Sequence, residues 1–96
     1  MKKSKKNKYT LEDRESAATE LAKNIRNIMK GLEITQTEFS EITKLRQGQV
    51  SEIIRGFRPN LSWFVLYQIA DSLDTSMESL IKGTYNLKKI KKHLDK

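Results

Sequence analysis

The clearest structural signal in this sequence lies in residues 35–56, which read Thr35-Gln-Thr-Glu-Phe-Ser-Glu-Ile-Thr-Lys-Leu-Arg-Gln-Gly-Gln-Val-Ser-Glu-Ile-Ile-Arg-Gly56. Thr35 and Glu38 form the outline of a capping box, which predicts the start of a short helix. Residues 43–46 are typical of a turn, and a second short helix is predicted over 47–55, with Gly56 at its end. The apolar residues expected to face the core from these two helices are Phe39, Ile42, Val50, Ile53 and Ile54.

Two short helices joined by a four-residue turn have the outline of a helix-turn-helix motif. In such a motif the second helix protrudes from the domain, and its side chains can enter the major groove of DNA, which is about 12 Å wide. The pattern therefore makes residues 47–55 candidates for contact with a nucleic acid.

Helical patterns also flank this motif. Apolar residues three or four apart between Leu11 and Leu32 predict a long first helix that ends near Gly31. Residues 10–13 have the outline of its capping box, with Asp13 in place of the usual glutamate.

Two further helices are predicted after a loop over residues 57–61. Ser62 is expected to cap a fourth helix, and Ser76 a fifth over 77–82 that ends at Gly83. The core residues expected in the fourth helix are Phe64, Val65, Leu66, Ile69, Ala70 and Leu73. Because no alternating strand pattern exceeds four residues, the sequence predicts an all-α fold of five helices.

The ends of the chain differ from its middle in charge. Residues 1–8 contain five lysines and no acidic residue, and residues 82–96 contain six lysines and Asp95, so each end carries +5. Residues 9–81 carry −3, yet four cations and a single acid fall within residues 44–58. A local basic stripe on a net-acidic domain indicates a polyanionic partner on one face. The two lysine-rich ends either attract phosphates or are merely solvated.

These observations predict three parts: a basic disordered tail at 1–9, a helix-turn-helix domain at 10–83 and a basic tail at 84–96. Leu87, Ile90 and Leu94 in the second tail have helical spacing. Because about ten residues are too few for a stable isolated helix, this segment folds on a partner protein, folds on a second copy or stays unfolded.

The residue inventory argues against catalysis. The chain has no cysteine and one histidine, His93, and its four glycines form no phosphate-binding loop. No metal and no cofactor is therefore predicted, and Glu38 and Glu41 are interpreted as a solvated face.

No apolar run is long enough for a membrane span, and acidic residues follow the first lysines where a signal peptide would be apolar. A cytoplasmic location is expected.

Residues 35–56 resemble the lambda-repressor-like, Xre-type (Cro-repressor) helix-turn-helix family. The resemblance continues through 59–62, 69–73 and 76–80, and covers roughly residues 20–82. It implies a five-helix DNA-binding domain. It also implies a sequence-specific transcriptional regulator of the repressor type, which binds double-stranded DNA as a homodimer on a two-fold operator.

The resemblance carries roles onto particular residues. Ser40 stands where the family has a small residue between the helices, and Leu45 stands where it has an apolar plug. The positions that would read bases are Gln47, Gly48, Gln49 and Glu52. Glutamine can pair with adenine, and glutamate can accept from cytosine N4. The candidates for phosphate contacts are Gln36, Lys44, Arg46, Arg55, Arg58 and Asn60.

Three residues depart from the family pattern. Lys44 replaces the usual turn glycine, which costs about 1 kcal/mol if the backbone there is left-handed. Arg46 replaces the usual serine or threonine cap, which also costs about 1 kcal/mol but suits a phosphate. Gly48 is unusual within a helix and suggests a close approach to the groove floor.

Other interpretations stay open. Trp63 and Tyr67 share a helix face, where they either complete the core or form a dimer contact. A HigA-type antitoxin is an alternative function, with residues 10–19 or 84–96 binding a toxin protein. A dimerising or RNA-binding adaptor without a specific DNA site is a second alternative. His93 is expected to have no role.

Overall fold

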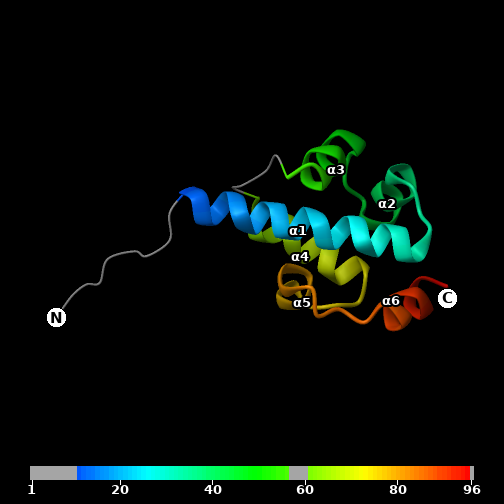
Figure 1. Cartoon of the computed structure of the whole chain (residues 1–96). Coiled ribbons are helices and arrows are strands. Elements are labelled where there is room, and N and C mark those ends of the chain that lie inside the picture. Colours follow the sequence, from blue (N-terminus) through cyan, green and yellow to red (C-terminus); the bar gives the residue numbers. More distant parts are fainter. Residues whose placement is uncertain (1–10, 57–60, 96) are drawn as a thin grey trace.

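The computed structural model describes residues 11–56 and 61–95. These residues form helices α1 (Leu11–Leu32), α2 (Gln36–Thr43), α3 (Gln47–Ile54), α4 (Trp63–Ser72), α5 (Met77–Lys82) and α6 (Leu87–Leu94) (Figure 1). No strand occurs in the two described ranges, in agreement with the predicted all-α fold. The tail predicted at 1–9, the first cap residue Thr10 and loop residues 57–60 lie outside those ranges. None of the described helices combines the length and the apolar composition needed to cross a membrane.

Side-chain caps start the short helices at the predicted residues. The hydroxyl of Thr35 accepts from the N–H of Glu38 (3.1 Å), and the Glu38 carboxylate accepts from the N–H of Thr35 (2.8 Å), which completes the capping box. Ser62 and Ser76 each accept from the N–H three residues further along, at 3.2 and 3.0 Å. These bonds satisfy N–H groups that have no partner inside the helix, so local sequence sets where α2, α4 and α5 begin.

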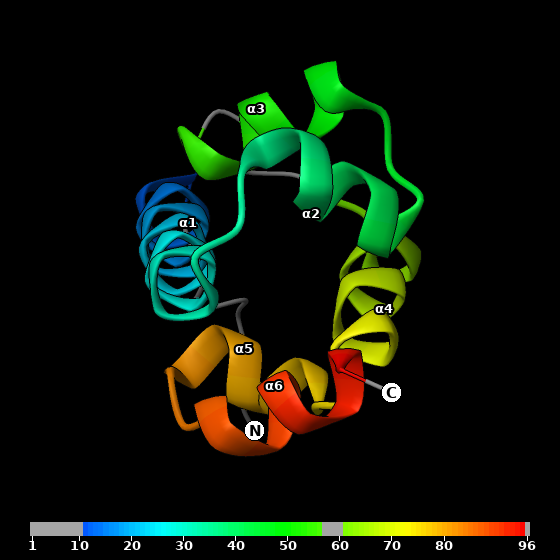
Figure 2. The same cartoon turned by 90° about the vertical axis from the view of Figure 1, so that its right-hand side faces the viewer.

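The core is enclosed by the long helix α1 and the shorter helices around it. Figure 2 shows α1 and α4 on opposite sides, α2 and α3 together at one pole, and α5 and α6 at the other. The largest fully buried apolar side chains come from every helix: Ile25, Ile28, Phe39, Val50, Ile69, Leu73, Leu80 and Ile90. The helix pair α2 and α3 and the C-terminal helix α6 therefore lie at opposite poles of one core.

The C-terminal helix α6 corrects the expectation for residues 84–96. Asn86 caps it by accepting from the N–H of Lys89 (3.1 Å), and the Ile90 side chain is 1% exposed within the core. Leu87 packs against Gly31 of α1 so closely that a Cβ at Gly31 would overlap it. The segment thus folds on its own domain, an outcome outside the three predicted, because α1 supplies apolar contacts that an isolated short helix lacks.

The aromatic residues of α4 are a second correction. Phe64 was expected in the core, but its side chain is 56% exposed, and Trp63 and Tyr67 are 69% and 44% exposed. Neither Trp63 nor Tyr67 therefore completes the core. Helical geometry explains Phe64, since five residues of rotation place it about 140° away from the buried Ile69. The core side of α4 is formed by Val65, Leu66, Ile69, Ala70 and Leu73.

A buried polar side chain joins α1 to α5. The Asn24 amide nitrogen donates to the carbonyl oxygens of Leu80 (2.7 Å) and Ile81 (3.1 Å), and Asn24 itself is 8% exposed. The last carbonyls of a helix have no partner within it. Asn24 therefore closes the C-terminal end of α5, where Gly83 adopts a left-handed φ of 76°.

Candidate nucleic-acid interface

In the turn between α2 and α3, Lys44 has the left-handed backbone conformation that was considered for this position from the sequence. Lys44 has φ 66° and ψ 21°, and its N–H donates to the Ser40 carbonyl (2.8 Å). The Ser40 hydroxyl donates in turn to the carbonyl of Leu45, whose side chain is buried. A small side chain and an apolar plug therefore hold the two helices together, and Lys44 carries the backbone cost that glycine would avoid.

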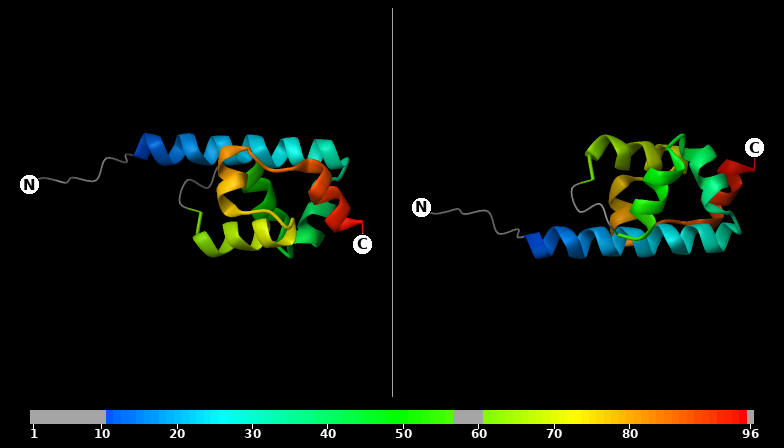
Figure 3. Two further views of the ribbon diagram at one scale, coloured as in Figure 1. Left: turned by 90° about the horizontal axis from the view of Figure 1, so that it is seen from below. Right: turned by 90° about the horizontal axis from the view of Figure 1, so that it is seen from above.

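The helix α3 is divided into a buried side and a polar side. Val50, Ile53 and Ile54 are buried, as predicted. On the other side Gln47, Gly48 and Glu52 are exposed and Gln49 is half-buried. Figure 3 (right) shows α3 on the outer surface of the molecule when it is viewed from above, so this polar side is open to a partner.

The structure brings most of the predicted base-reading residues together. Gly48, Gln49 and Glu52 line one open hollow of about 600 Å³, and the predicted phosphate ligand Arg46 lines it with them. Gln47 is placed differently, because its side-chain oxygen accepts a long hydrogen bond from the Thr37 hydroxyl of α2 (3.5 Å). The two glutamines therefore face different parts of the surface.

Gly48 is not required by the protein's own packing. A Cβ built on it would meet no atom within 4 Å, and its φ is not left-handed. A glycine inside a helix costs roughly 0.5–1 kcal/mol relative to alanine. Nothing within the described residues explains why glycine occurs at this position. A glycine there would allow a binding partner to approach the helix backbone closely.

The predicted phosphate ligands surround this helix where the structure describes them. Gln36 is exposed at the first position of α2, and Lys44 and Arg46 are exposed at and after the turn. Arg46 occupies the N-cap of α3 without a side-chain capping bond. Arg55 is exposed and bends back to donate to the hydroxyl of Ser51 (2.8 Å). Arg58 and Asn60 lie outside the described residues.

Two bracing residues were missed by the sequence analysis. Arg26 of α1 donates to the carbonyl of Ile54 at the end of α3 (2.5 Å), and Gln68 of α4 donates to the carbonyl of Thr43 at the end of α2 (2.7 Å). Each satisfies a C-terminal carbonyl and fixes one helix of the motif to the scaffold. No sequence signal marks them, because ordinary exposed positions also carry arginine and glutamine.

A helix-turn-helix whose second helix presents an open polar face beside exposed cations defines a DNA-binding protein of the helix-turn-helix class. The model of the Cro/C1-type helix-turn-helix DNA-binding domain matches residues 24–83, more than half of the chain, and the chain belongs to that family. The match spans α2 to α5 and the last nine residues of α1, whereas α6 lies beyond it. Comparisons with curated proteins and with solved structures gave no significant match.

Proposed function

We propose that this protein is a sequence-specific transcriptional regulator of the repressor type, with α3 seated in the major groove. The observation that carries the proposal is the hollow lined by Arg46, Gly48, Gln49 and Glu52 on the open side of α3. Hydrogen-bonding side chains on a protruding helix can read base edges in the major groove. Such a regulator works at the chromosome, so the cytoplasmic location expected from the sequence accompanies this proposal.

Each residue expected to contact DNA receives a role in this proposal. Gln47, Gln49 and Glu52 read bases, and Gly48 lets the DNA approach the helix backbone. The side chains that hold phosphates, and so set the position without reading sequence, are Gln36, Lys44, Arg46, Arg55, Arg58 and Asn60. The N-terminus of α2 supports the role of Gln36, since the helix dipole favours an anion there.

The test is a selection on random duplexes followed by affinity measurements on the enriched site. Gln49→Ala should weaken binding to that site about 10-fold or more, since a bidentate base contact is worth about 1–3 kcal/mol. Gln47→Ala should relax preference at a different base pair. Glu41→Ala is the matched control, because Glu41 is exposed on α2 outside the hollow. Enrichment of no sequence, or unchanged affinity in both glutamine variants, would contradict the proposal.

A homodimer fits this function because one short helix reads too few base pairs for high specificity. Trp63, Phe64 and Tyr67 form an exposed cluster on α4, with ring centroids 5.7 to 6.5 Å apart. Aromatic residues are enriched in protein interfaces, and a patch of this kind favours association. We propose that this cluster meets its copy across the two-fold axis, with half-sites about 34 Å apart.

Sedimentation of the full chain tests the dimer. The double variant Trp63→Ser and Phe64→Ser should sediment as a folded monomer at a concentration where the wild type is dimeric. Ile81→Ser is the matched control, because Ile81 is an exposed apolar residue on α5, outside the cluster. A monomeric wild type, or a dimer that survives the double change, would remove this part of the proposal.

The antitoxin function is the alternative. The first turns of α1 extend beyond the other helices (Figure 3), and Glu12, Asp13, Glu15 and Glu20 are exposed there. An acidic projection of this kind could contact a basic toxin. Co-purification of the full chain with the product of an adjacent toxin-sized gene would favour this function over a phage-type repressor.

A further inference from the structure

The helix α6 is polarised between an apolar side and lysines. Ile90 is buried and Leu87 and Leu94 are half-buried, so these three residues attach the helix to the domain. The remaining positions carry four exposed lysines and one half-buried histidine: Lys88, Lys89, Lys91, Lys92 and His93. Only the three apolar residues are needed to attach α6 to the core, so packing does not explain why the other positions carry lysines.

Repulsion between its own lysines weakens α6. Lysines three and four residues apart repel each other on a helix surface, as Lys88 does with Lys91 and Lys92. Lys88 and Lys89 also lie in the first turn, next to the positive end of the helix dipole, whereas Lys91 and Lys92 lie in the last turn, where the dipole favours them. Within residues 11–56 and 61–95, none of the four lysines makes an ion pair. An anionic partner would relieve this repulsion.

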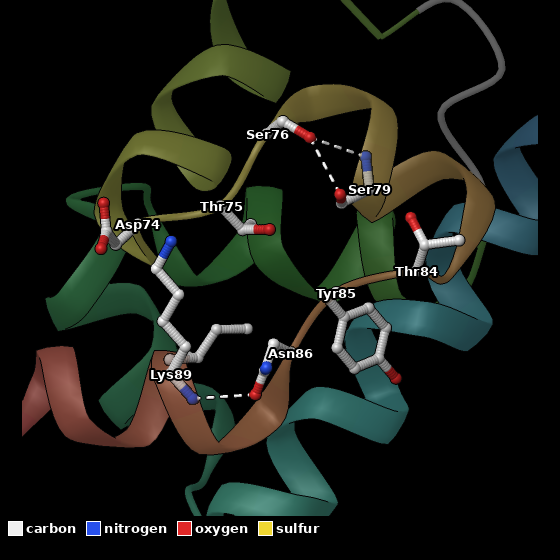
Figure 4. Close-up of a pocket in the computed structure, with 9 residues that line it drawn as sticks. Asp74, Thr75, Ser76, Ser79, Thr84, Tyr85, Asn86 and Lys89 are labelled. Atoms are coloured by element: carbon white, nitrogen blue, oxygen red, sulfur yellow. Dashed lines mark hydrogen bonds between the residues drawn. The ribbon is translucent and has the colours of Figure 1, made fainter.

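Asp74 is the carboxylate that shares a hollow with lysines of α6. Figure 4 shows the Lys89 side chain directed toward Asp74, and both residues line a pocket of about 470 Å³. Asp74 also lines a smaller hollow of about 120 Å³ with Lys89, Lys92 and His93. Asp95, at the C-cap of α6, is a second carboxylate close to the helix. Two carboxylates can offset two of the four lysine charges, so the helix keeps an excess of two. Lys88 and Lys91 line neither of these hollows.

The position of α6 decides which polyanion it can meet. Figures 1 and 2 both place α3 at one pole of the molecule and α6 at the other, with the core between them. A duplex seated on α3 therefore lies on the side away from the α6 lysines. The α6 lysines are therefore not placed to contact a DNA segment that is bound on α3.

We propose that the lysine face of α6, defined as Lys88, Lys91 and Lys92, binds the phosphate backbone of a second DNA duplex without reading its sequence. One protomer then bridges two DNA segments, one on α3 and one on α6. This inference rests on the proposed function for the first of the two contacts. It extends that function, because it turns a site-specific binder into a protein that joins distant DNA.

The chemistry of the face favours DNA over an acidic protein. Protein interfaces are enriched in aromatic residues and depleted of lysine, whereas the outer side of α6 carries no apolar side chain. Lysine ammonium groups act as point charges that suit a phosphate backbone and need no defined geometry. DNA held on α3 of neighbouring molecules also supplies duplex at high local concentration.

A bridging assay on the full chain tests the inference. A duplex with the selected site is attached to beads, protein is added, and capture of a fluorescent duplex of unrelated sequence is measured. Wild-type protein should capture the second duplex, and 0.5 M salt should release it, because phosphate contacts weaken steeply with salt. The triple variant Lys88→Gln, Lys91→Gln and Lys92→Gln should hold the first duplex within about 3-fold of wild type and lose capture of the second.

A comparison at equal loss of two charges controls for net charge, and the double variant Lys88→Gln with Lys91→Gln should lose most of the capture. Lys23→Gln with Lys30→Gln removes exposed lysines from α1 and should retain capture. The triple variant keeps the apolar side of α6, and it removes both the repulsion between lysines and the favourable dipole contacts of Lys91 and Lys92. Its thermal midpoint should therefore stay within about 5 °C of that of the wild type. Binding of the first duplex without capture of the second by wild type would overturn this inference alone. Equal capture by the triple variant would do the same, and no binding to either duplex would overturn the proposed function as well.

Discussion

Arg26 of α1 donates a hydrogen bond to the carbonyl oxygen of Ile54, at the end of α3, over a distance of 2.5 Å. The two residues are 28 positions apart in the sequence. Through this bond the long helix closes the open C-terminal end of the recognition helix and limits its tilt. A cation also interacts favourably with the negative end of a helix dipole. The orientation of α3 therefore depends on a residue that lies outside the proposed base-reading set.

Replacing Arg26 should loosen the recognition helix without unfolding the domain. Arg26→Met removes a charged hydrogen bond, and the partly exposed position reduces its contribution to about 1–2 kcal/mol of the unfolding free energy. Urea denaturation measures this change. Lys23→Met removes the same charge from the same helix and should change stability by less than about 0.5 kcal/mol. Equal losses in the two variants would exclude a role for the Arg26 bond.

Asn24 should be more important for stability than its exposed neighbour on α1. Asn24→Ala leaves the carbonyls of Leu80 and Ile81 without the amide that they share, which costs about 1–3 kcal/mol for buried groups. Asn27→Ala is the control, because Asn27 is exposed one turn further along the same helix. Thermal unfolding of the two variants should separate them by several degrees, and coincident curves would contradict the prediction.

Lys44 combines a backbone cost with a charge near the turn. Lys44→Gly should raise the unfolding free energy by up to about 1 kcal/mol, because glycine adopts the observed φ of 66° without strain. Lys44→Asn removes the same charge at a smaller stability gain. If Lys44 contacts a phosphate, both variants should reduce the log–log salt slope of DNA binding by about 0.9 per protomer. An unchanged slope would remove Lys44 from the phosphate ligands.

Replacing Gly48 should change stability and DNA affinity in opposite directions. Gly48→Ala should stabilise the protein by roughly 0.5–1 kcal/mol, since alanine favours the helix and its Cβ meets no atom within 4 Å. The same change should weaken binding to the selected DNA site if the groove floor approaches the α3 backbone. Urea denaturation and a titration with labelled duplex measure the two effects. A variant that is more stable and binds with wild-type affinity would show that Gly48 is not at the contact.

Local sequence determined where α2, α4 and α5 begin and which family motif the helices form. Thr35, Glu38, Ser62 and Ser76 act within three residues of their own positions, so their capping bonds follow from short-range geometry alone. The buried side of α3 follows from helical period in the same way. These features could be predicted because they need no knowledge of distant residues.

Only the tertiary structure decided which polar side chains form hydrogen bonds between helices and which apolar side chains remain exposed to solvent. The bonds of Arg26, Asn24 and Gln68 join positions 25 to 57 residues apart, and no local pattern encodes such pairs. The burial of Ile90 depends on α1, and the exposure of Phe64 depends on how α4 is rotated against the core. A side chain's surroundings are set by the packing of whole helices, whereas a cap is set by its immediate neighbours.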